Sequence, residues 1–460
     1  MTTAITTVNP ATGRPIATYA GWDAGRIDAA VDRAHTAATA WARVPVAERA
    51  RLAARLAVTL REHSGRLASL AVEEMGKPRR QAEGEVEKSA LTAEYYARQG
   101  PGILADEQVE VGGADAWVAY EPAGLVLAVM PWNFPVWQVM RFAIPSLVAG
   151  NGVLLKHAAN VTGSALALQD IFTAAGFPEH LVTALVVAEP DVPDATARLI
   201  GDDRIAAVTL TGSNRAGAAV GAAAGRAAKK SVLELGGSDA FVVLDDADIE
   251  AAAAAAVTAR FANTGQSCVC AKRFILSAPI AEAFTSAFTA GVEALRMGDP
   301  RQEDTQVGPL AREDLRTAIH RQVTESVVAG AKLLTGGEPL PGDGYFYRPT
   351  VLAHTAPGMP AFDEETFGPL AALTVARDDD DAVRLANATP YGLGLSVWTG
   401  DRARGLALAR RITSGAAFIN AIVASDPRLP FGGTKHSGHG RELAAAGIRE
   451  FTNTRTYWIA

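Results

Sequence analysis

Residues 206–221 read AAVTLTGSNRAGAAVG, and the order of residue types in this stretch decides the fold class. An apolar run is followed by a tight turn at Gly212 and Ser213, and then by small residues at helical spacing. A buried strand, a glycine turn and a helix in this order form one unit of a parallel α/β sheet, and the helix start is a natural anion site. The stretch lacks both the GxGxxG fingerprint of dinucleotide-binding proteins and the Gly-Lys-Ser/Thr of a Walker loop, so it does not identify a ligand alone.

The same alternation of strands and helices extends through the middle of the chain. Short apolar runs bounded by Gly or Pro suit strands that are buried on both faces, and they occur at 125–130, 152–155, 181–187, 204–210 and 231–235. We therefore predict a doubly wound, mostly parallel sheet over this region. After Gly236 and Gly237 a second series of strands and helices begins, and it predicts a second α/β domain.

The beginning of the chain follows a different pattern. The first hundred residues are expected to be mostly helical, with a stop at Gly100-Pro101 and helices at 23–41, 46–74 and 81–98. Residues 109–121 look extended and could form a hairpin arm that leaves the first domain. Near the other end, 451–458 is rich in Thr and aromatic residues, which favours a strand.

Composition and charge exclude several classes of protein. Hydrophobic residues make up 48% of the chain and charged residues 20%, so the chain can bury a large core and is not a disordered or fibrous protein. Acidic residues outnumber basic ones by 50 to 43 and no basic block occurs, which argues against a nucleic-acid partner. The charge run at 377–381 is most simply the solvated start of a helix.

The amino terminus and the cysteines indicate a cytoplasmic protein. Residues 1–21 have neither the basic segment nor the apolar segment of a signal peptide. No apolar stretch reaches the roughly 18 residues that a transmembrane helix needs, so no membrane partner is expected. Two cysteines, Cys268 and Cys270, cannot build a disulfide framework and fit a reducing compartment.

The sequence NTGQSCVCAKR, 263–273, holds the strongest candidate nucleophile. Cys268 follows a polar turn that contains glycine, and polar surroundings with nearby backbone N–H groups suit a reactive thiolate. The alternative is that Cys268 is a small buried hydrophobic residue. A metal site is not expected, because Cys-x-Cys has no second cysteine pair and no His partner at ligand spacing.

Two further stretches offer an oxyanion donor and a general base. Asn133 lies between two prolines in MPWNFP, 130–135, directly after a predicted buried strand. Its amide could donate to a developing oxyanion, or it could be a turn residue. Glu234 in VLELGG, 232–237, lies near the carboxyl end of a predicted strand, where ligands bind in parallel sheets. Burial there would raise its pKa and suit a general base, and the alternative is a structural Glu bonded to loop amides.

Together with four more stretches, these motifs resemble the aldehyde dehydrogenase superfamily over essentially the whole chain. The further stretches are EEMGKP at 73–78, LLKHAAN at 154–160, EETFGP at 364–369 and PFGGTKHSGHGRE at 430–442. Each piece alone is a weak signal, whereas their joint occurrence in this order is specific. Within the superfamily, LLKHAANVTG, RAGAAVG and VLELGGSDAF are most similar to the bacterial NAD(P)-dependent succinate-semialdehyde dehydrogenases.

The resemblance implies an aldehyde-dehydrogenase-like α/β fold with a Rossmann-type cofactor domain. That NAD(P)-binding domain would take 1–103 and 123–235, and a second α/β catalytic domain would take 236–440. A small β oligomerisation arm would combine 104–122 with 441–460. Because an exposed strand pair is a liability in a monomer, a homodimer or homotetramer is expected.

The resemblance also implies how an aldehyde would be oxidised with NADP or NAD as cofactor. Cys268 would attack the aldehyde as a thiolate, and the Asn133 amide and the Cys268 N–H would hold the oxyanion. Hydride would pass to the nicotinamide, and Glu234 would activate water to release the acid from the thioester. The cofactor would be held by Trp132, Lys156, His157, Ala158, Ala159, Gly212, Ser213, Leu235, Glu365 and Phe367. Ala159 stands where NAD-specific members often carry Glu, so both cofactors are expected to be accepted.

For the substrate, the resemblance implies succinate semialdehyde. Arg141 and Ser425 match the Arg and Ser that clamp the remote carboxylate in those relatives, and Trp137 is a further candidate substrate-binding residue. The second Arg of some members is Ala262 here. A structural salt bridge explains Arg141 equally well, because an unpaired buried cation is costly. Some of these relatives carry the same Cys-x-Cys, which makes Cys270 a candidate redox partner of the nucleophile.

Other functions remain open at this point. The aldehyde could be another short-chain or phosphorylated one. Cys268 could instead serve a cofactor-independent thiol acyl-transferase or hydrolase, or a related CoA-acylating enzyme. Glu234 and the helix start at Gly212-Ser213 argue against both of these. A catalytically silent protein on the same fold is disfavoured, because Cys268, Glu234 and Asn133 are all present.

Overall fold

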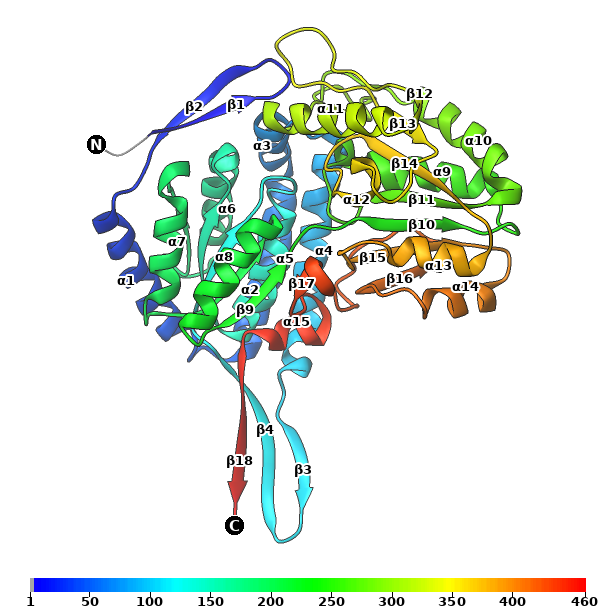
Figure 1. Cartoon of the computed structure of the whole chain (residues 1–460). Helices are drawn as coiled ribbons and strands as arrows, with labels where there is room; N and C mark the ends of the chain where they lie inside the picture. Colours follow the sequence, from blue (N-terminus) through cyan, green and yellow to red (C-terminus); the bar gives the residue numbers. More distant parts are fainter. Residues whose placement is uncertain (1–3) are drawn as a thin grey trace.

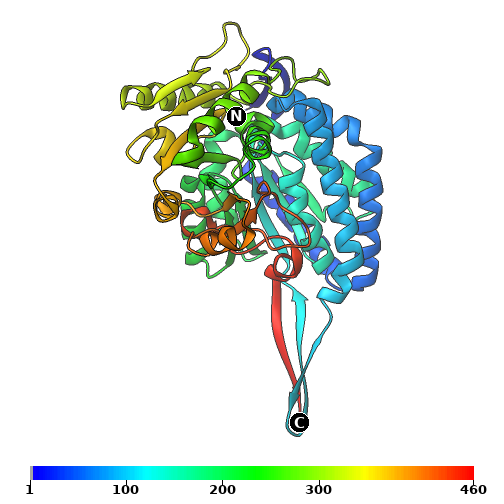
Figure 2. The same ribbon diagram turned by 90° about the vertical axis from the view of Figure 1, so that its right-hand side faces the viewer.

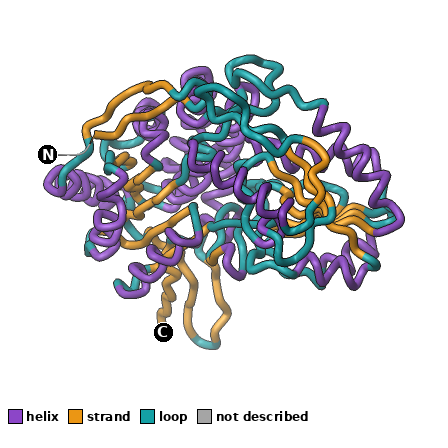
Figure 3. Tube along the Cα trace, turned by 45° about the horizontal axis from the view of Figure 1, so that its top comes forward, coloured by secondary structure: helices purple, strands orange, loops and turns teal. Residues whose placement is uncertain are grey.

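The computed structural model describes residues 4–460. These residues form two α/β lobes that lie side by side and a narrow three-stranded arm that projects away from them (Figure 1). Seen with the top turned forward, helices lie on both sides of the strands in each lobe (Figure 3). The predicted α/β fold is therefore confirmed.

The sheet of the first lobe is built mainly of parallel strands. They are β5 (Leu125–Met130), β6 (Gly152–His157), β7 (Val182–Leu185), β8 (Ile205–Thr211), β9 (Lys230–Glu234) and the short β17 (Gly438–His439). They lie in the order β17-β9-β8-β5-β6-β7, with β17 antiparallel to β9. The chain order reverses between β5 and β8, and ligands bind at the carboxyl ends of strands at such a point.

Alternating side chains of β5 explain why this sheet has helices on both faces. Val126 and Ala128 belong to one core, and Leu125 and Leu127 to the other. The first core is covered by α2 (Val46–Glu62), α4 (Arg79–Ile103), α5 (Trp137–Ala149) and α6 (Thr162–Ala174), and the second by α1 (Ala24–Trp41), α7 (Val192–Gly201) and α8 (Asn214–Arg226). Two shorter helices, α3 (Ser64–Met75) and α15 (Ala444–Glu450), pack against α4 and α5.

The second lobe repeats this arrangement. Its strands are β10 (Asp239–Val243), β11 (Ala271–Ser277), β12 (Lys332–Thr335), β13 (Thr350–Ala353), β14 (Leu370–Ala376), β15 (Gly394–Trp398) and β16 (Ala416–Ile419), in the order β12-β13-β14-β11-β10-β15-β16. One face packs against α9 (Ile249–Phe261) and α10 (Ala281–Glu293), the other against α13 (Asp379–Asn387) and α14 (Arg402–Ala409). Near β13 and β14 lie α11 (Glu313–Val328) and α12 (Pro360–Asp363).

The arm is an antiparallel sheet with β4 (Ala114–Pro122) between β3 (Glu107–Val111) and β18 (Thr452–Ile459). It stands clear of both lobes in two views at right angles (Figures 1 and 2). Trp117 and Tyr457 face each other across β4 and β18, with ring centroids 4.9 Å apart in a stacked arrangement. A second two-stranded unit, β1 (Ala4–Asn9) with β2 (Arg14–Ala20), lies beside α3.

Two sequence predictions for the first hundred residues are wrong, and one element there was not predicted. The helix predicted over 46–74 is divided at His63 into α2 and α3. The helix predicted to stop at Gly100-Pro101 continues to Ile103. Gly100 is a packing residue, since a Cβ there would lie 2.6 Å from a Val148 methyl of α5, and it does not mark the end of the helix. The β1–β2 hairpin was not predicted; in the structure β1 alternates between exposed and buried positions, whereas β2 is largely exposed.

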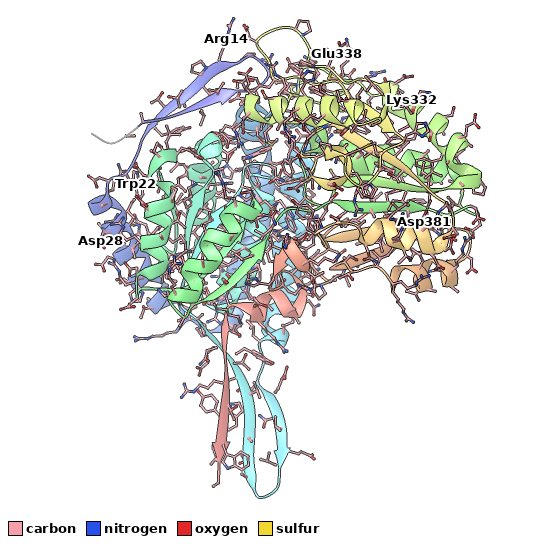
Figure 4. The ribbon with its side chains drawn as sticks, viewed as in Figure 1. Arg14, Trp22, Asp28, Lys332, Glu338 and Asp381 are labelled. Atoms are coloured by element: carbon pink, nitrogen blue, oxygen red, sulfur yellow. The ribbon has the colours of Figure 1, made fainter. Side chains whose placement is uncertain are left out.

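The acidic run at 377–381 does begin a helix. Asp378 caps α13 by accepting a hydrogen bond from the Asp381 N–H at 2.8 Å. Asp381, labelled in Figure 4, is buried and paired with Arg377 and Arg384, so this carboxylate is not simply solvated. Those two partners hold its pKa well below the ordinary range.

Two segments lie outside the domains that the sequence predicts for them. Residues 438–439 extend the first sheet as β17, although 236–440 is predicted as the second domain. Residues 444–450 form α15 against α5, so of 441–460 the arm takes only β18. Within residues 4–460, no helix has the length and apolar character needed to cross a membrane.

Candidate active site

The candidate site lies at the point where the strand order of the first lobe reverses. β5 leads into 131–135, and β8 leads into Gly212 and Ser213 at the start of α8. A cavity of about 250 Å³, here called the first cavity, opens between these turns. Its lining includes Trp132, Asn133, Gln138, Gly212, Ser213, Leu235, Cys268, Arg312, Glu365 and Phe367. The structure thus brings together residues that lie far apart in the sequence.

Cys268 lies between two cavities. The second cavity, of about 300 Å³, is also lined by Cys268, together with Lys88, Trp137, Gln138, Arg141, Cys270, Ser425 and Phe431. A thiol in this position can contact a molecule in one cavity and a molecule in the other. This is the geometry that a reaction between two separately bound reactants needs.

The loop that carries Cys268 has an uncommon backbone. Asn263, Thr264 and Gly265 have φ angles of 54°, 57° and 73°, in the left-handed region. At Gly265 a Cβ would lie 2.4 Å from the carbonyl oxygen of Gly368, so glycine is required there. This tight approach fixes the loop against the second lobe.

Lys272 holds the same loop from the other side. Its buried ammonium donates to the carbonyl oxygens of Ser267 at 3.1 Å and Cys268 at 2.9 Å. The carboxylate of Glu365 lies 3.5 Å away and balances its charge. Lys272 therefore positions the residue on which the chemistry would occur.

The environment of the Cys268 thiol differs from the prediction. Burial raises the pKa of the thiol to about 12, and Arg141 and Lys272 only partly oppose this effect. The expectation of a thiolate in polar surroundings is corrected, because the side chain packs against the apolar core of the first lobe. The thiol stays protonated until a base removes its proton.

Glu234 is the buried carboxyl group at the end of β9. Its pKa is raised well above the ordinary value, first by burial and then by the nearby Glu442, while Arg141 and Arg441 act in the opposite direction. The predicted direction of this shift is confirmed. Its Oε1 atom is buried and has no hydrogen-bond partner among the described residues, so it can take a proton or hold a water.

Asn133 is held by the loop of Cys268. Its Nδ2 donates to the carbonyl of Gln266 at 3.0 Å, and its own carbonyl accepts from Asn263 Nδ2 at 2.8 Å. An amide nitrogen carries two hydrogens, and one of them is left for a ligand. Because Asn133 and Cys268 both line the first cavity, that hydrogen is available to an oxyanion formed at the thiol.

The remaining walls of the first cavity suit a nucleotide. Ser213 caps α8 by accepting from the Ala216 N–H at 3.3 Å, which leaves the helix N-terminus facing the cavity. Glu365 accepts from the Gly237 N–H at 2.9 Å. Trp132 and Phe367 pack edge to face at 5.6 Å. Among residues 4–460, no cluster of three His, Cys, Asp or Glu could hold a metal ion.

Four predicted cofactor residues, Lys156, His157, Ala158 and Ala159, lie at the end of β6, which neighbours β5, and none of them is among the residues that line the first cavity. His157 is buried, its Nε2 donates to the Pro135 carbonyl at 2.9 Å, and its Nδ1 accepts from the Ala158 N–H at 3.0 Å. Burial lowers the pKa of His157 to about 4, so it is neutral at pH 7. The predicted cofactor residue His157 therefore brings no positive charge to the site at pH 7, and its hydrogen bonds to the backbone are structural.

Comparisons with known proteins agree with this geometry. The model of the aldehyde dehydrogenase family matches residues 1–457. The chain belongs to the aldehyde dehydrogenase family. It is 48% identical to the succinate semialdehyde dehydrogenase [NAD(P)+] Sad of Escherichia coli, with 98% of this chain and 97% of the relative covered. It is 46% identical to succinate-semialdehyde dehydrogenase [NADP(+)] 1 of Mycobacterium tuberculosis, with 99% and 100% covered. The structure of succinic semialdehyde dehydrogenase from Streptococcus pyogenes in complex with NADP+ matches with a TM-score of 0.96 at 33% identity, covering 99% of both chains.

In this aldehyde dehydrogenase, Arg141 forms a buried ion pair. Its guanidinium pairs with Glu442, donates to Thr211 Oγ1 at 3.2 Å, and lies 4.7 Å from the centroid of the Phe431 ring. The sequence allows two roles for Arg141, a substrate clamp or a structural salt bridge, and the structure shows the salt bridge. The side chain still lines the second cavity, but its charge is already balanced.

The second cavity of the aldehyde dehydrogenase holds another cation that sequence reasoning missed. Lys88 of α4 donates to Ser425 Oγ at 2.7 Å, and its ammonium lies 4.5 Å from the centroid of the Trp137 ring. Lys88 thus contacts both Ser425 and Trp137, two residues predicted to bind the substrate, and all three line the second cavity. Cys270 lines this cavity as well and is a buried free thiol.

Four residues at the site were not singled out from the sequence, and they are Lys88, Gln138, Lys272 and Glu442. Glu442 closes the quoted motif PFGGTKHSGHGRE, and the cost of burying Arg141 alone was a signal that such an acid exists. Lys272 follows the nucleophile closely, but a lysine in a polar segment reads as exposed. Lys88 has no local signal, because it reaches the cavity only through the packing of α4 on α5.

Proposed function

We propose that this aldehyde dehydrogenase oxidises an aldehyde to a carboxylic acid with NADP or NAD, and that succinate semialdehyde is its preferred substrate. The observation that carries the proposal is the position of Cys268 at the junction of two cavities. One cavity ends at a helix N-terminus suited to phosphate, and the other contains cationic and hydroxyl groups suited to a carboxylate.

The cofactor would be held in the first cavity. Trp132, Gly212, Ser213, Leu235, Glu365 and Phe367 line it and would contact the cofactor. Lys156, Ala158 and Ala159, at the end of the neighbouring strand β6, would extend the binding site. At Gly217 a Cβ would lie 2.4 Å from a Leu235 methyl, so α8 approaches the strand ends closely, as a nucleotide cradle requires. When bound, the nicotinamide supplies the hydride acceptor for the oxidation.

The protein's own residues would carry the remaining steps. Cys268 loses its proton to solvent, and its sulfur adds to the aldehyde carbon. The Asn133 amide and the Cys268 N–H hold the oxyanion of the resulting hemithioacetal. After oxidation to a thioester, Glu234 takes a proton from water, and the hydroxide releases the acid from Cys268.

The substrate part of the proposal is supported by the named relatives and by the second cavity. The relatives from Escherichia coli, Mycobacterium tuberculosis and Streptococcus pyogenes are all named for succinate semialdehyde. Trp137, Ser425 and Lys88 give the cavity an aromatic wall, a hydroxyl and a cation, which suit a short chain that ends in a carboxylate.

The test is a panel of aldehydes with each cofactor, followed by the absorbance of the reduced nicotinamide. We expect succinate semialdehyde to give the highest kcat/KM, above uncharged butanal and above phosphorylated aldehydes, with both NADP and NAD. Turnover of no aldehyde with either cofactor would remove the dehydrogenase proposal and favour a cofactor-independent thiol enzyme. A higher kcat/KM for another aldehyde would replace the substrate alone.

We also propose that the enzyme works in the cytoplasm as a homodimer or homotetramer. Both cysteines are free thiols, and one of them is the proposed nucleophile, which fits a reducing compartment. The assembly is supported by the exposed arm, because an unpaired sheet edge attracts another chain.

A further inference from the structure

The second cavity contains a cation that forms no ion pair with the residues that the structure describes. Lys88 Nζ donates to Ser425 Oγ at 2.7 Å, and no carboxylate of residues 4–460 forms an ion pair with it. The two acids that act on it from nearby, Glu85 and Asp426, are each engaged elsewhere. Glu85 pairs with the buried Lys77, and Asp426 pairs with Arg428 at 2.6 Å.

Arg141 differs from Lys88 in this respect. Both side chains line the second cavity, but Arg141 is paired with Glu442, and both of those groups are buried. A ligand carboxylate at Arg141 would compete with a carboxylate that is already in place. At Lys88 the same carboxylate would meet a half-buried ammonium whose hydrogen-bond partner is a neutral hydroxyl and which lies over an aromatic ring.

The hydrogen bonds around Lys88 leave donors free for an anion. An ammonium has three N–H donors, and one of them goes to Ser425. Because the Ser425 oxygen accepts that bond, its own hydrogen is available. Lys88 and Ser425 can therefore offer hydrogen bonds to the same carboxylate, while the Trp137 ring keeps the ammonium in place.

We propose that Lys88, together with Ser425, binds the carboxylate of the substrate in the second cavity and selects short aldehydes that end in an anionic group. This inference rests on the proposed function. It assigns the recognition of the substrate carboxylate to Lys88 of α4 and not to Arg141. The ion pair of Arg141 with Glu442 has a structural role in the wall of the second cavity.

The first experiment measures kcat/KM for succinate semialdehyde and for uncharged butanal in the wild type, Lys88→Met and Lys88→Arg. For Lys88→Met we expect the ratio of the two kcat/KM values to fall about 100-fold, equal to about 2.8 kcal/mol, mainly through KM for succinate semialdehyde. Lys88→Arg keeps the charge and should retain most of that ratio. Lys332→Met, an exposed lysine on β12 at the outer edge of the second lobe (Figure 4), is the matched control and should change neither value.

A fall of less than tenfold in the ratio for Lys88→Met overturns the proposal, as does an equal loss on both aldehydes. If the wild type itself does not prefer succinate semialdehyde to butanal, the substrate of the proposed function fails instead. Ser425→Ala should lower the same ratio by a smaller factor, about fivefold, since it removes one neutral donor.

A second measurement needs no substitution. Burial lowers the pKa of Lys88 to about 8, with Arg141 acting in the same direction and Asp426 and Glu85 opposing it. The ammonium is therefore lost as the pH rises through about 8. We expect kcat/KM for succinate semialdehyde to fall above this pH relative to that for butanal. Parallel pH profiles for the two aldehydes contradict the role of Lys88.

Discussion

Burial sets the reactivity of the two groups that matter most at the level of single residues. Cys268 and Glu234 both have raised pKa values because they are taken out of water, so each holds its proton more tightly than it would in solution. A thiol with such a pKa is unreactive while the site is at rest. A carboxyl group with a raised pKa is a stronger base once it is ionised. The same physical effect therefore protects the nucleophile and strengthens the base.

Glu234→Gln should separate the two halves of the reaction. With the base removed, we expect one burst of reduced cofactor, equal to the enzyme concentration, and then a steady-state rate at least about 100-fold slower. Because the pKa of Glu234 is raised, the wild-type rate should fall on the acid side at a higher pH than an ordinary Glu would give. Rapid mixing with absorbance detection checks both points. Cys268→Ala is the control and should show no burst; a Glu234→Gln variant with neither a burst nor a slower steady state would make Glu234 structural.

Cys270 should couple the activity to oxidants. It lies in a turn with Cys268, since its N–H donates to the Ser267 carbonyl at 3.4 Å, and both thiols line the second cavity. Peroxide would oxidise the two thiols to one disulfide with release of two waters, and a strained bond of this kind is readily reduced. We expect peroxide to inactivate the wild type and dithiothreitol to restore it, whereas Cys270→Ala should recover only in part, because the remaining sulfenic acid is oxidised further. Identical loss and recovery in both proteins would exclude the pair as a switch.

At the level of elements, the end of β6 is tied to the turn that carries Asn133. His157 is the last residue of β6, and its Nε2 donates to the Pro135 carbonyl in that turn. A charged imidazole keeps this donor, but it can no longer accept the hydrogen bond from the Ala158 N–H. The neutral histidine thus makes both bonds, one within β6 and its exit and one to the turn that carries the oxyanion donor.

The free energy of unfolding should carry the signature of this histidine. The pKa of His157 is about 4 in the folded protein, below the ordinary 6.5, so between these two pH values the unfolded chain binds the proton more readily than the folded protein does. Stability from this group is full above pH 6.5 and is lost as the pH falls to about 4, by about 3 kcal/mol in total. His157→Gln removes the titration. Urea unfolding at pH 7 and at pH 4.5 should show a smaller pH effect in the variant; equal pH effects in the two proteins would mean that His157 is not held neutral.

The sequence predicted those elements whose residues alone determine them. The strands of the first sheet are apolar at every position because both faces are covered, and β8 with its glycine turn was readable for that reason. Elements fixed by distant packing were not readable. Gly100 and Pro101 look like a helix stop, yet α4 continues to Ile103, and Gly100 instead allows α4 to pack closely on α5. The β1–β2 hairpin packs against α3, and its outer strand β2 is largely exposed.

The site shows the same division. Cys268, Glu234 and Asn133 stand in motifs with turns or prolines around them, and the structure brings the three together. Lys88 and Glu442 stand in no such context. Lys88 is one lysine among the charged residues of a long helix. Its contacts in the second cavity are with Trp137 of α5 and with Ser425, which lies in a distant loop. A contact between segments more than 300 residues apart cannot be read from either segment alone.

At the scale of the whole molecule, the arm is the part whose sheet projects away from the rest of its own chain. β3, β4 and β18 form a sheet outside both lobes, and the side chains on its faces stand clear of the rest of the chain (Figure 4). Val109, Trp458 and Ile459 are 45%, 59% and 56% exposed. A small sheet is stable when it buries an apolar face, and neither lobe of the same chain covers a face of the arm. A second copy of the chain can cover such a face, and closed symmetry makes the same contact twice.

The oligomeric state should therefore depend on the tip of β18. Trp458→Glu with Ile459→Glu places two charges on the apolar part of the arm, where burial against a partner would cost several kcal/mol. We expect the wild type to have the mass of a dimer or tetramer by sedimentation, and the double variant to have a smaller mass. Val328→Glu is the matched control, because Val328 is 84% exposed at the end of α11, far from the arm, and its substitution should leave the mass unchanged. The cofactor cavity lies within one chain, so the double variant should still bind NADP. A wild type with the mass of one chain, or a double variant that keeps the wild-type mass, would show that the arm does not join subunits.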